Sequence, residues 1–211
     1  MEESIMSNNL LEQLEQERFL PLYTATDLNY LKSAAEILLE HGLHFIEVTY
    51  RSDLASQAIE ELTKYPDLVV GAGTVRNLET AKEAIKHGAK FIVTPGLDEK
   101  IVRYCQEQDI PVVPGAVTPT EIMQANELGL SVVKFFPANI YGGLAAIKAL
   151  SGPFADVRFV PTGGVTLENY PDFLANPHIL AVGGSFILSE KLLINDNAKA
   201  QSILDQLTKN K

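Results

Sequence analysis

The residue with the least ordinary surroundings in this sequence is a lysine, Lys134. It follows Val132 and Val133 and precedes Phe135 and Phe136, and a β-branched and aromatic run closed by a proline is typical of a buried strand. Burial in apolar surroundings disfavours the charged form of an amine and frees its lone pair, as Schiff-base chemistry on a carbonyl substrate requires. The alternative is structural: a lysine that extends its ammonium from a strand end to water, or that pairs with a carboxylate.

A second group of polar residues lies in the run 44–51. Strand alternation puts Glu47, Thr49 and Arg51 on one face of a predicted strand. In the functional interpretation, Glu47 is a carboxylic general acid/base and Arg51 binds a substrate carboxylate through paired hydrogen bonds. A structural Glu–Arg pair within the strand is the alternative, because buried charges are usually paired.

The elements that must position these residues follow a repeat of roughly 21 to 25 residues, in which a strand-like run precedes a helix-like run. The predicted strands are 20–24, 44–50, 68–72, 90–94, 111–114, 131–136, 157–161 and 179–182. Eight such units within about 200 residues match a compact barrel. An open doubly wound sheet is the alternative, but the first strand is not followed by Gly-x-Gly-x-x-Gly.

We therefore predict an α/β fold consisting of a single (β/α)₈ TIM barrel with a short N-terminal helix. Residues 1–18 are predicted to form an N-terminal tail and a capping helix that carries Leu10, Leu11 and Leu14. Residues 19–211 are predicted to form the catalytic barrel domain. In such a barrel the chemistry lies at the C-terminal ends of the strands.

Three of those strand ends are rich in glycine. The third strand ends at Gly71-Ala72-Gly73-Thr74, where glycine allows a ligand to approach closely and the threonine hydroxyl can bond to it. The seventh ends at Thr162-Gly163-Gly164 and the eighth at Gly183-Gly184-Ser185. Barrels commonly bind phosphate through backbone N–H groups after these two strands. Plain tight turns are the alternative.

The composition excludes several functions. A chain of 211 residues with 46% hydrophobic and 21% charged residues is typical of one soluble domain. The formal net charge of -10 argues against nucleic-acid and anionic-membrane partners. The single cysteine, Cys105, cannot form an internal disulfide, and no apolar run could span a bilayer, so we predict a cytoplasmic protein. The histidines form no cluster with acidic residues, and no metal or other cofactor is predicted.

Several motifs together, in order and spacing, resemble the 2-keto-3-deoxy-6-phosphogluconate (KDPG) aldolase family across nearly the whole chain. These motifs are Glu47-Val48-Thr49-x-Arg51, Gly71-Ala72-Gly73-Thr74, Pro95-Gly96, Lys134-Phe135-Phe136-Pro137-Ala138, Pro161-Thr162-Gly163-Gly164 and Gly183-Gly184-Ser185. The resemblance implies a homotrimeric, metal-independent class I aldolase of the Entner–Doudoroff pathway. It implies cleavage of KDPG to pyruvate and glyceraldehyde 3-phosphate, and of 4-hydroxy-2-oxoglutarate (KHG) to pyruvate and glyoxylate.

The resemblance also assigns roles to residues. Lys134 becomes the Schiff-base lysine and Glu47 the proton-transferring base. The residues implied at the pyruvate end of the substrate are Arg51, Thr74 and Pro95, and those implied at its phosphate are Thr162, Gly163, Gly164, Gly183, Gly184 and Ser185.

Several other functions stay open at the level of the sequence. Tyr23 and Tyr50 depart from the residues more usual in the family and leave the substrate preference open. A 2-keto-3-deoxy-6-phosphogalactonate aldolase is a close alternative. The more distant ones are another sugar-phosphate barrel enzyme, such as an isomerase or decarboxylase, a metal-dependent aldolase with Glu47 as a ligand, and a non-catalytic sugar-phosphate binding protein.

Overall fold

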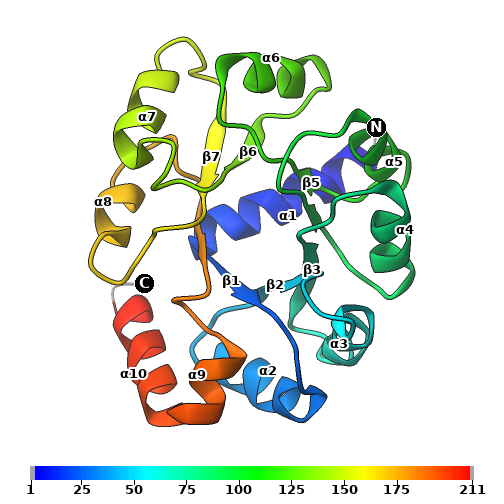
Figure 1. Cartoon of the computed structure of the whole chain (residues 1–211), viewed down its shortest axis with the longest axis vertical. Coiled ribbons are helices and arrows are strands. Elements are labelled where there is room, and N and C mark those ends of the chain that lie inside the picture. Colours follow the sequence, from blue (N-terminus) through cyan, green and yellow to red (C-terminus); the bar gives the residue numbers. More distant parts are fainter. Residues whose placement is uncertain (1–2, 210–211) are drawn as a thin grey trace.

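The computed structural model describes the backbone of residues 3–209 and the side chains of residues 9–209. Within these residues, eight parallel strands form a ring that the helices surround (Figure 1). The strands are β1 (Phe19–Tyr23), β2 (Phe45–Thr49), β3 (Val69–Gly73), β4 (Ile92–Val93), β5 (Val112–Val113), β6 (Val132–Phe135), β7 (Arg158–Pro161) and β8 (Val182–Gly184).

The helices alternate with the strands. They are α1 (Glu3–Glu17), the 3₁₀ turn η1 (Leu28–Tyr30), α2 (Leu31–Glu40), α3 (Ala55–Leu62), α4 (Leu78–Lys86), α5 (Glu99–Glu107), α6 (Pro119–Glu127), α7 (Gly143–Leu150), α8 (Tyr170–Leu174), α9 (Glu190–Asn195) and α10 (Asn197–Thr208). None of the described helices combines the length and the apolar composition needed to cross a membrane.

The ring consists of two pieces of sheet. Six strands pair in the order β5-β4-β3-β2-β1-β8, and β6 pairs with β7. Single bridges join the pieces: Gly115 pairs with Lys134 between β5 and β6, and Phe159 pairs with Ile179 between β7 and β8. A further bridge joins Thr162 to Gly183. We call the β5–β6 and β7–β8 contacts the two seams, and they close the ring into the predicted barrel.

The predicted strands all overlap the observed ones, with one shift at the end of the chain. The eighth strand was predicted at 179–182 but comprises Val182–Gly184. Glycine is disfavoured in strands, so the sequence pattern ends before Gly183 and Gly184. Their pairing with Leu20 and Pro21 of β1 overrides that preference.

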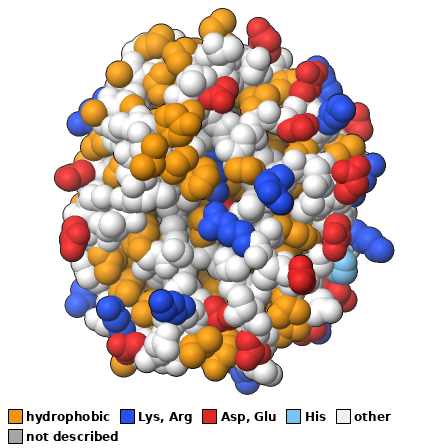
Figure 2. Space-filling model, in the orientation of Figure 1, with side chains coloured by type: hydrophobic (Ala, Val, Ile, Leu, Met, Phe, Trp, Pro, Cys, Tyr) orange, Lys and Arg blue, Asp and Glu red, His pale blue; other side chains and the backbone are white. Residues whose placement is uncertain are grey.

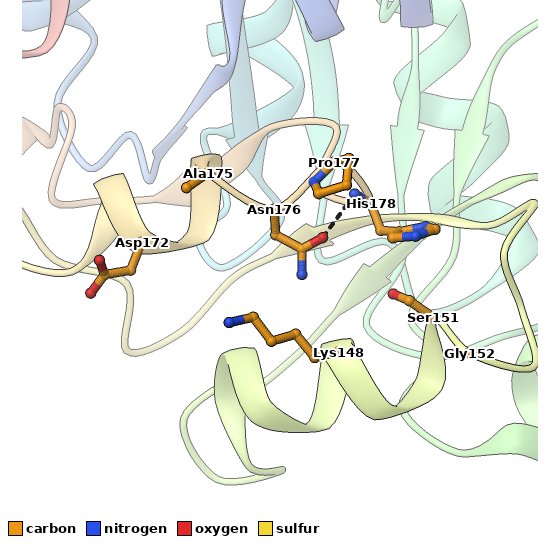
Figure 3. A pocket seen from close by; sticks show the side chains of 8 residues that line it. All are labelled: Lys148, Ser151, Gly152, Asp172, Ala175, Asn176, Pro177 and His178. Carbon is orange, nitrogen blue, oxygen red and sulfur yellow. Dashed lines mark hydrogen bonds between the residues drawn. The ribbon is translucent and has the colours of Figure 1, made fainter.

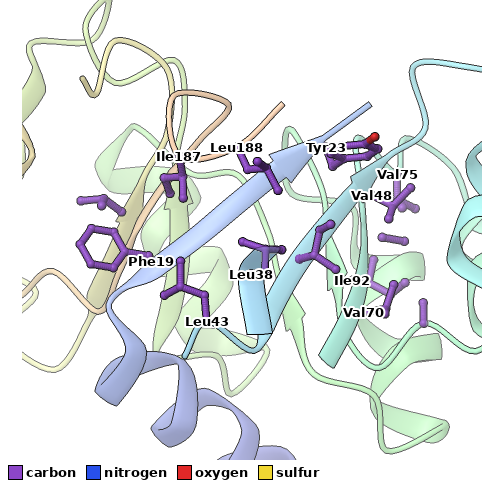
Figure 4. Close-up of a cluster of buried hydrophobic side chains, with 14 of the residues drawn as sticks. Phe19, Tyr23, Leu38, Leu43, Val48, Val70, Val75, Ile92, Ile187 and Leu188 are labelled. Carbon is purple, nitrogen blue, oxygen red and sulfur yellow. The ribbon is translucent and has the colours of Figure 1, made fainter. Parts of the chain in front are cut away.

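Buried apolar side chains form two clusters, one on each side of the strand ring. The outer cluster lies between strands and helices and includes Phe19, Leu38 and Val48 (Figure 4). The inner cluster fills the barrel and includes Phe45, Phe91, Val132 and Val160. Because successive strand residues point to opposite faces, the residues two positions after these inner ones also point into the barrel.

Helix α1 packs against the inner cluster through Leu14, which is 1% exposed, with Leu10 and Leu11 beside it. The carboxylate of Glu17 accepts hydrogen bonds from the backbone N–H groups of His44 (2.8 Å) and Phe45 (3.0 Å), which attaches the end of α1 to the start of β2. The helix begins at Glu3, earlier than predicted. Residues 1 and 2 of the predicted tail lie outside the described residues, and the division into 1–18 and 19–211 stays a prediction.

Candidate active site

Lys134 and Glu47 point into the barrel from strands that are far apart in the sequence. On β6, Val132 belongs to the inner cluster, and Val133 and Phe135 belong to the outer one, so Lys134 faces inward. On β2, Phe45 faces inward by the same alternation, and Glu47 follows it two residues later. Both charged side chains therefore lie one layer above the apolar filling of the barrel.

The two side chains meet in a nearly dry environment. Lys134 Nζ donates a hydrogen bond to Glu47 Oε1 at 3.3 Å, and the side chains are 4% and 1% exposed. The other carboxylate oxygen, Glu47 Oε2, is buried and has no hydrogen-bond partner among the described residues. The ammonium also lies 5.3 Å from the centre of the Phe136 ring. Buried carboxylates normally have partners for both oxygens, so this pair is incompletely satisfied.

Two glycines of β3 make room for this arrangement. A Cβ atom at Gly73 would collide with the carboxylate of Glu47, and one at Gly71 would collide with the ring of Phe91. The strand therefore needs glycine at both inward positions: Gly71 leaves space for the Phe91 ring, and Gly73 leaves space for the Glu47 carboxylate. The sequence suggested that these glycines allow a ligand to approach, and this stays a prediction. The structure shows that they also accommodate neighbouring side chains.

A threonine pair lies next to Glu47. The hydroxyl oxygens of Thr24 and Thr49 are 2.6 Å apart, and Thr49 is fully buried. Strand alternation had put Thr49 on the same face as Glu47, but its partner at the end of β1 was not foreseen. The pair links the C-terminal ends of β1 and β2 beside the candidate acid/base.

Arg51 and Thr74 come together at the ends of β2 and β3. The Nε group of Arg51 donates to Thr74 Oγ1 at 3.1 Å, and Arg51 is exposed whereas Thr74 is half-buried. Thr74 has a φ of 58°, a left-handed conformation that is uncommon for a residue with a branched Cβ. Pro95, the third predicted residue of this group, is half-buried after β4.

The predicted phosphate residues lie at the ends of β7 and β8, which the bridge between Thr162 and Gly183 joins. Gly163 and Gly164 both have positive φ values, 85° and 81°, so this turn requires glycine. Gly184 is buried in β8 and Ser185 is exposed in the turn after it. The structure brings the two turns together as predicted; that they bind phosphate stays a prediction.

The turn after β7 is also tied to the strand that carries Lys134. The N–H of Ala138 donates to Thr162 O at 2.8 Å, and the N–H of Asn139 donates to Gly163 O at 3.1 Å. The side chain of Asn139 lies where a Cβ atom at Gly164 would be. The segment after β6 and the candidate phosphate turn are therefore neighbours.

A buried carboxylate that the sequence did not single out holds the loop after β1. Glu190 accepts hydrogen bonds from the backbone N–H groups of Thr26 (2.8 Å) and Asp27 (3.1 Å) and from the Thr26 hydroxyl. Burial, together with the nearby Glu190 carboxylate, raises the pKa of the Tyr23 phenol. No motif marks these contacts, because they join opposite ends of the sequence.

The side chains that usually hold metals do not gather at this site. The His, Cys, Asp and Glu residues that the structure describes form no group of three or more able to hold a metal ion. Cys105 is buried on α5, and burial raises the pKa of its thiol to about 12, so it is protonated near neutral pH. That the protein needs no metal stays a prediction.

Another pocket, of about 430 Å³, lies between α7, α8 and the segment before β8 (Figure 3). Lys148 of α7 points into it from below Asn176, whose Oδ1 accepts from the N–H of His178 at 2.9 Å. The C-terminal ends of α7 and α8 border the pocket, and helix C-termini favour a nearby cation. We therefore infer that Lys148 stabilises these helix ends. None of the predicted site residues lines this pocket.

The class that these features define is a (β/α)₈ barrel with a buried lysine–carboxylate pair at its centre. The model of the KDPG and KHG aldolase family matches residues 10–204. The chain is 40% identical over 195 residues to the 2-dehydro-3-deoxy-phosphogluconate aldolase of Haemophilus influenzae, an alignment that covers 92% of each chain. The chain therefore belongs to the KDPG and KHG aldolase family, as the sequence motifs indicated.

Two solved structures of similar proteins bear on the site. The 2-keto-3-deoxy-6-phosphogluconate aldolase of Zymomonas mobilis, determined with 3-phosphoglycerate, is 35% identical, with a TM-score of 0.89 and coverage of 95% of this chain and 96% of that one. The KDPG aldolase of Legionella pneumophila, determined with pyruvate captured as a covalent carbinolamine, is 34% identical, with a TM-score of 0.84 and coverage of 91% and 93%.

Proposed function

We propose that this protein is a class I aldolase that cleaves KDPG to pyruvate and glyceraldehyde 3-phosphate and also acts on KHG. The observation that carries the proposal is the buried, incompletely satisfied pair of Lys134 and Glu47, 3.3 Å apart in a chain of the aldolase family. A purely structural ion pair would be expected to satisfy both carboxylate oxygens. The covalent pyruvate adduct of the Legionella relative supports the same chemistry.

In this mechanism Lys134 is the nucleophile. Its neutral amine adds to the C2 carbonyl of the substrate to give a carbinolamine, which loses water to become an iminium. Removal of the proton from the C4 hydroxyl then breaks the C3–C4 bond, and the electron pair of that bond moves into the iminium. Glyceraldehyde 3-phosphate leaves, and an enamine of pyruvate stays on the lysine.

Glu47 moves the protons of these steps. Its carboxylate is within hydrogen-bond distance of Nζ, and its partner-free oxygen is available to substrate or to a water molecule. It accepts the C4 hydroxyl proton, through water, and returns a proton to C3 of the enamine. Water then adds to the resulting iminium, which releases pyruvate and regenerates the amine.

The two ends of the substrate engage different residues. Arg51, Thr74 and Pro95 bind the carboxylate end, which the contact between the Arg51 and Thr74 side chains supports. At the other end, backbone N–H groups and hydroxyls bind the phosphate. The 3-phosphoglycerate in the Zymomonas structure supports an anion site in the family. The proposed phosphate-binding residues are Thr162, Gly163, Gly164, Gly183, Gly184 and Ser185.

Borohydride trapping tests the central step. Incubation with pyruvate and borohydride is expected to reduce the iminium to a stable secondary amine, and peptide mass analysis is expected to find it on Lys134. Aldol cleavage is expected to survive dialysis against a chelator, since no metal takes part. An adduct on another lysine, or activity lost with the metal, would contradict the mechanism.

Substitution of Ser185 tests the phosphate end. Ser185→Asp adds a negative charge and is expected to lower kcat/KM for KDPG by about 10² or more, since each hydrogen bond to a charged group contributes roughly 1.5 to 3 kcal/mol. Cleavage of KHG, which has no phosphate, is expected to change much less. An equal loss for both substrates would show that Ser185 supports the fold or the lysine instead.

We also propose that the protein is a homotrimer and works in the cytoplasm, with no nucleic-acid or membrane partner. Light scattering coupled to size-exclusion chromatography is expected to give about three times the chain mass of 23.1 kDa. A monomeric mass would contradict the trimer and leave the barrel chemistry unaffected.

A further inference from the structure

A pocket of about 280 Å³ opens beside the proposed phosphate site. It lies between the end of β1, the turn after β8 and helix α9, and it is lined by Leu22 and Thr24 from the first, Ser185 from the second, and Glu190 and Lys191 from the third. No motif of the sequence drew attention to α9. Among the residues that the structure describes, Lys191 of this helix is the one cation that lines the pocket.

Two residues that line the pocket connect it to the barrel interior. Leu22 belongs to the apolar cluster inside the barrel, and Thr24 is hydrogen-bonded to Thr49 at 2.6 Å, on the strand that carries Glu47. Ser185, at the other wall, is one of the proposed phosphate residues. The pocket therefore borders both the barrel interior and one of the proposed phosphate residues.

One wall of the pocket is fixed by Glu190. Its carboxylate accepts hydrogen bonds from the N–H groups of Thr26 and Asp27 and from the Thr26 hydroxyl, and the residue is 5% exposed. These bonds hold the loop after β1 against α9. The Glu190 carboxylate is therefore occupied by its hydrogen bonds to this loop, although Glu190 directly precedes Lys191 in the chain.

Lys191 is exposed and has no carboxylate within 4.0 Å among the residues that the structure describes. It stands in the first turn of α9, after the N-cap Ser189, where a positive charge is opposed by the helix dipole. Neither an ion pair nor helix stability accounts for its position. Lys199 has a similar place in the first turn of α10, so the feature that distinguishes Lys191 is its position in the pocket beside Ser185.

We propose that Lys191 supplies the positive charge that recognises the phosphate of the substrate, and so sets the preference for phosphorylated over unphosphorylated keto acids. This rests on the proposed aldolase function. The formal net charge of -10 repels a phosphate dianion at long range. Figure 2 shows basic side chains near the middle of the face in view and others, mixed with acidic ones, toward its edge, where α9 lies in Figure 1. Backbone N–H groups orient the phosphate, and Lys191 neutralises it.

The first test compares two substrates. Lys191→Met is expected to lower kcat/KM for KDPG by about 10-fold, as loss of one charged hydrogen bond predicts, and to change kcat/KM for KHG less than about 2-fold. Lys191→Arg is expected to keep most of the preference. The matched control is Lys199→Met, which removes another exposed lysine from the first turn of a helix, α10, outside the pocket.

The second test does not depend on catalysis. Calorimetric titration with inorganic phosphate is expected to give a dissociation constant about 10-fold higher for Lys191→Met than for the unaltered protein and Lys199→Met. Equal phosphate affinity in all three proteins would overturn the role of Lys191. A protein that cleaves neither substrate but loses phosphate affinity on Lys191→Met would overturn the aldolase proposal and keep the anion site.

Discussion

Glu17 and Glu47 are both buried carboxylates that contact β2, but their hydrogen bonding differs. Glu17 lies at the start of the strand, where its oxygens accept from two backbone N–H groups at 2.8 and 3.0 Å and contact Nδ1 of His44 at 3.2 Å. Glu47 lies within the strand and has one partner, Lys134, at 3.3 Å, while its second oxygen has none among the described residues.

This difference distinguishes a structural carboxylate, Glu17, from a candidate catalytic one, Glu47, at the same strand. A carboxylate whose oxygens are satisfied by backbone groups stabilises the fold, because removing it leaves buried donors unpaired. A carboxylate left with an unused lone pair costs stability, and the cost is explained if a substrate or water takes that position during the reaction. The two kinds of site are therefore expected to respond oppositely to substitution.

The largest expected effect is that of Lys134→Met. Loss of the nucleophile is expected to lower cleavage of KDPG by at least ~10⁴-fold, because the iminium forms on Lys134. The melting temperature is expected to change little, because methionine fills the apolar surroundings of the lysine stem. Pyruvate release and thermal unfolding measure the two quantities. A large fall in melting temperature would instead favour a structural ion pair, whose disruption costs about 3 to 5 kcal/mol.

Glu47→Gln keeps the shape of the side chain and removes its ability to accept a proton. Turnover is expected to fall by about 10²- to 10⁴-fold, the usual worth of general acid–base catalysis. Trapping with pyruvate and borohydride is still expected to modify Lys134, since the amine is intact. Near-normal turnover would assign Glu47 to the same structural class as Glu17.

Gly73→Ala displaces Glu47 without changing it. The added methyl collides with the carboxylate, so turnover is expected to fall by about 10²-fold, with a stability loss of about 1 to 3 kcal/mol from overpacking. Gly96→Ala is the control, because a Cβ atom there meets nothing within 4 Å. Equal activity of the two variants would show that Glu47 can move without loss of function.

Glu17→Ala is expected to reverse the pattern of the preceding variants. It leaves the N–H groups of His44 and Phe45 without acceptors, and the free energy of unfolding is expected to fall by about 2 kcal/mol. Turnover at a temperature where the variant is folded is expected to be unchanged. Urea denaturation measures the loss, and Glu12→Ala on the exposed side of α1 is the control. A selective loss of turnover would contradict the structural role of Glu17.

The smallest expected effect concerns a third carboxylate, Glu121, at the start of α6. Burial opposes its ionisation, but hydrogen bonds from the N–H groups of Val117 and Thr118 and from the Thr118 hydroxyl outweigh burial and lower its pKa. The carboxylate therefore stabilises the fold above the pKa of the unfolded chain, and this contribution is lost as the pH falls through the folded-state pKa.

Glu121→Ala is accordingly expected to lower the free energy of unfolding by about 1 kcal/mol near pH 7. The difference from the unaltered protein is expected to shrink as the pH falls from the unfolded-state pKa, about 4.3, through the lower folded-state pKa, below which both states bind the proton. Urea denaturation at a series of pH values measures it. A difference that is independent of pH would show that the loss comes from helix propensity or packing alone.

Much of the fold could be predicted because its signals are local. The strand-like runs and the glycines that end helices repeat along the chain, and eight such units admit few arrangements. Lys134 stood out because a charge between β-branched and aromatic residues violates the strand pattern. The boundary of β8 was missed for the opposite reason, since Gly183 and Gly184 join the strand through their neighbours in β1 and not through their own preference.

The rest of the site depends on contacts that the sequence does not encode locally. Alternation indicated the face of Glu47, but not that Lys134 would be its partner or that one oxygen would have none. The loop anchored by Glu190 joins residues from the two ends of the chain. The fit between Gly73 and the Glu47 carboxylate depends on the register of β2 and β3, which packing and pairing set together.

The seam between β5 and β6 has a consequence for motion. Glu47 belongs to the six-stranded piece of sheet and Lys134 to the two-stranded piece. At the level of the lysine, two backbone hydrogen bonds hold the pieces together: Lys134 N donates to Pro114 O at 2.8 Å, and Ala116 N donates to Lys134 O at 3.0 Å. An opening of the ring at this seam would change the distance between amine and carboxylate directly. Amide hydrogen exchange at Lys134 and Ala116 therefore reports how often the reacting groups fall out of alignment.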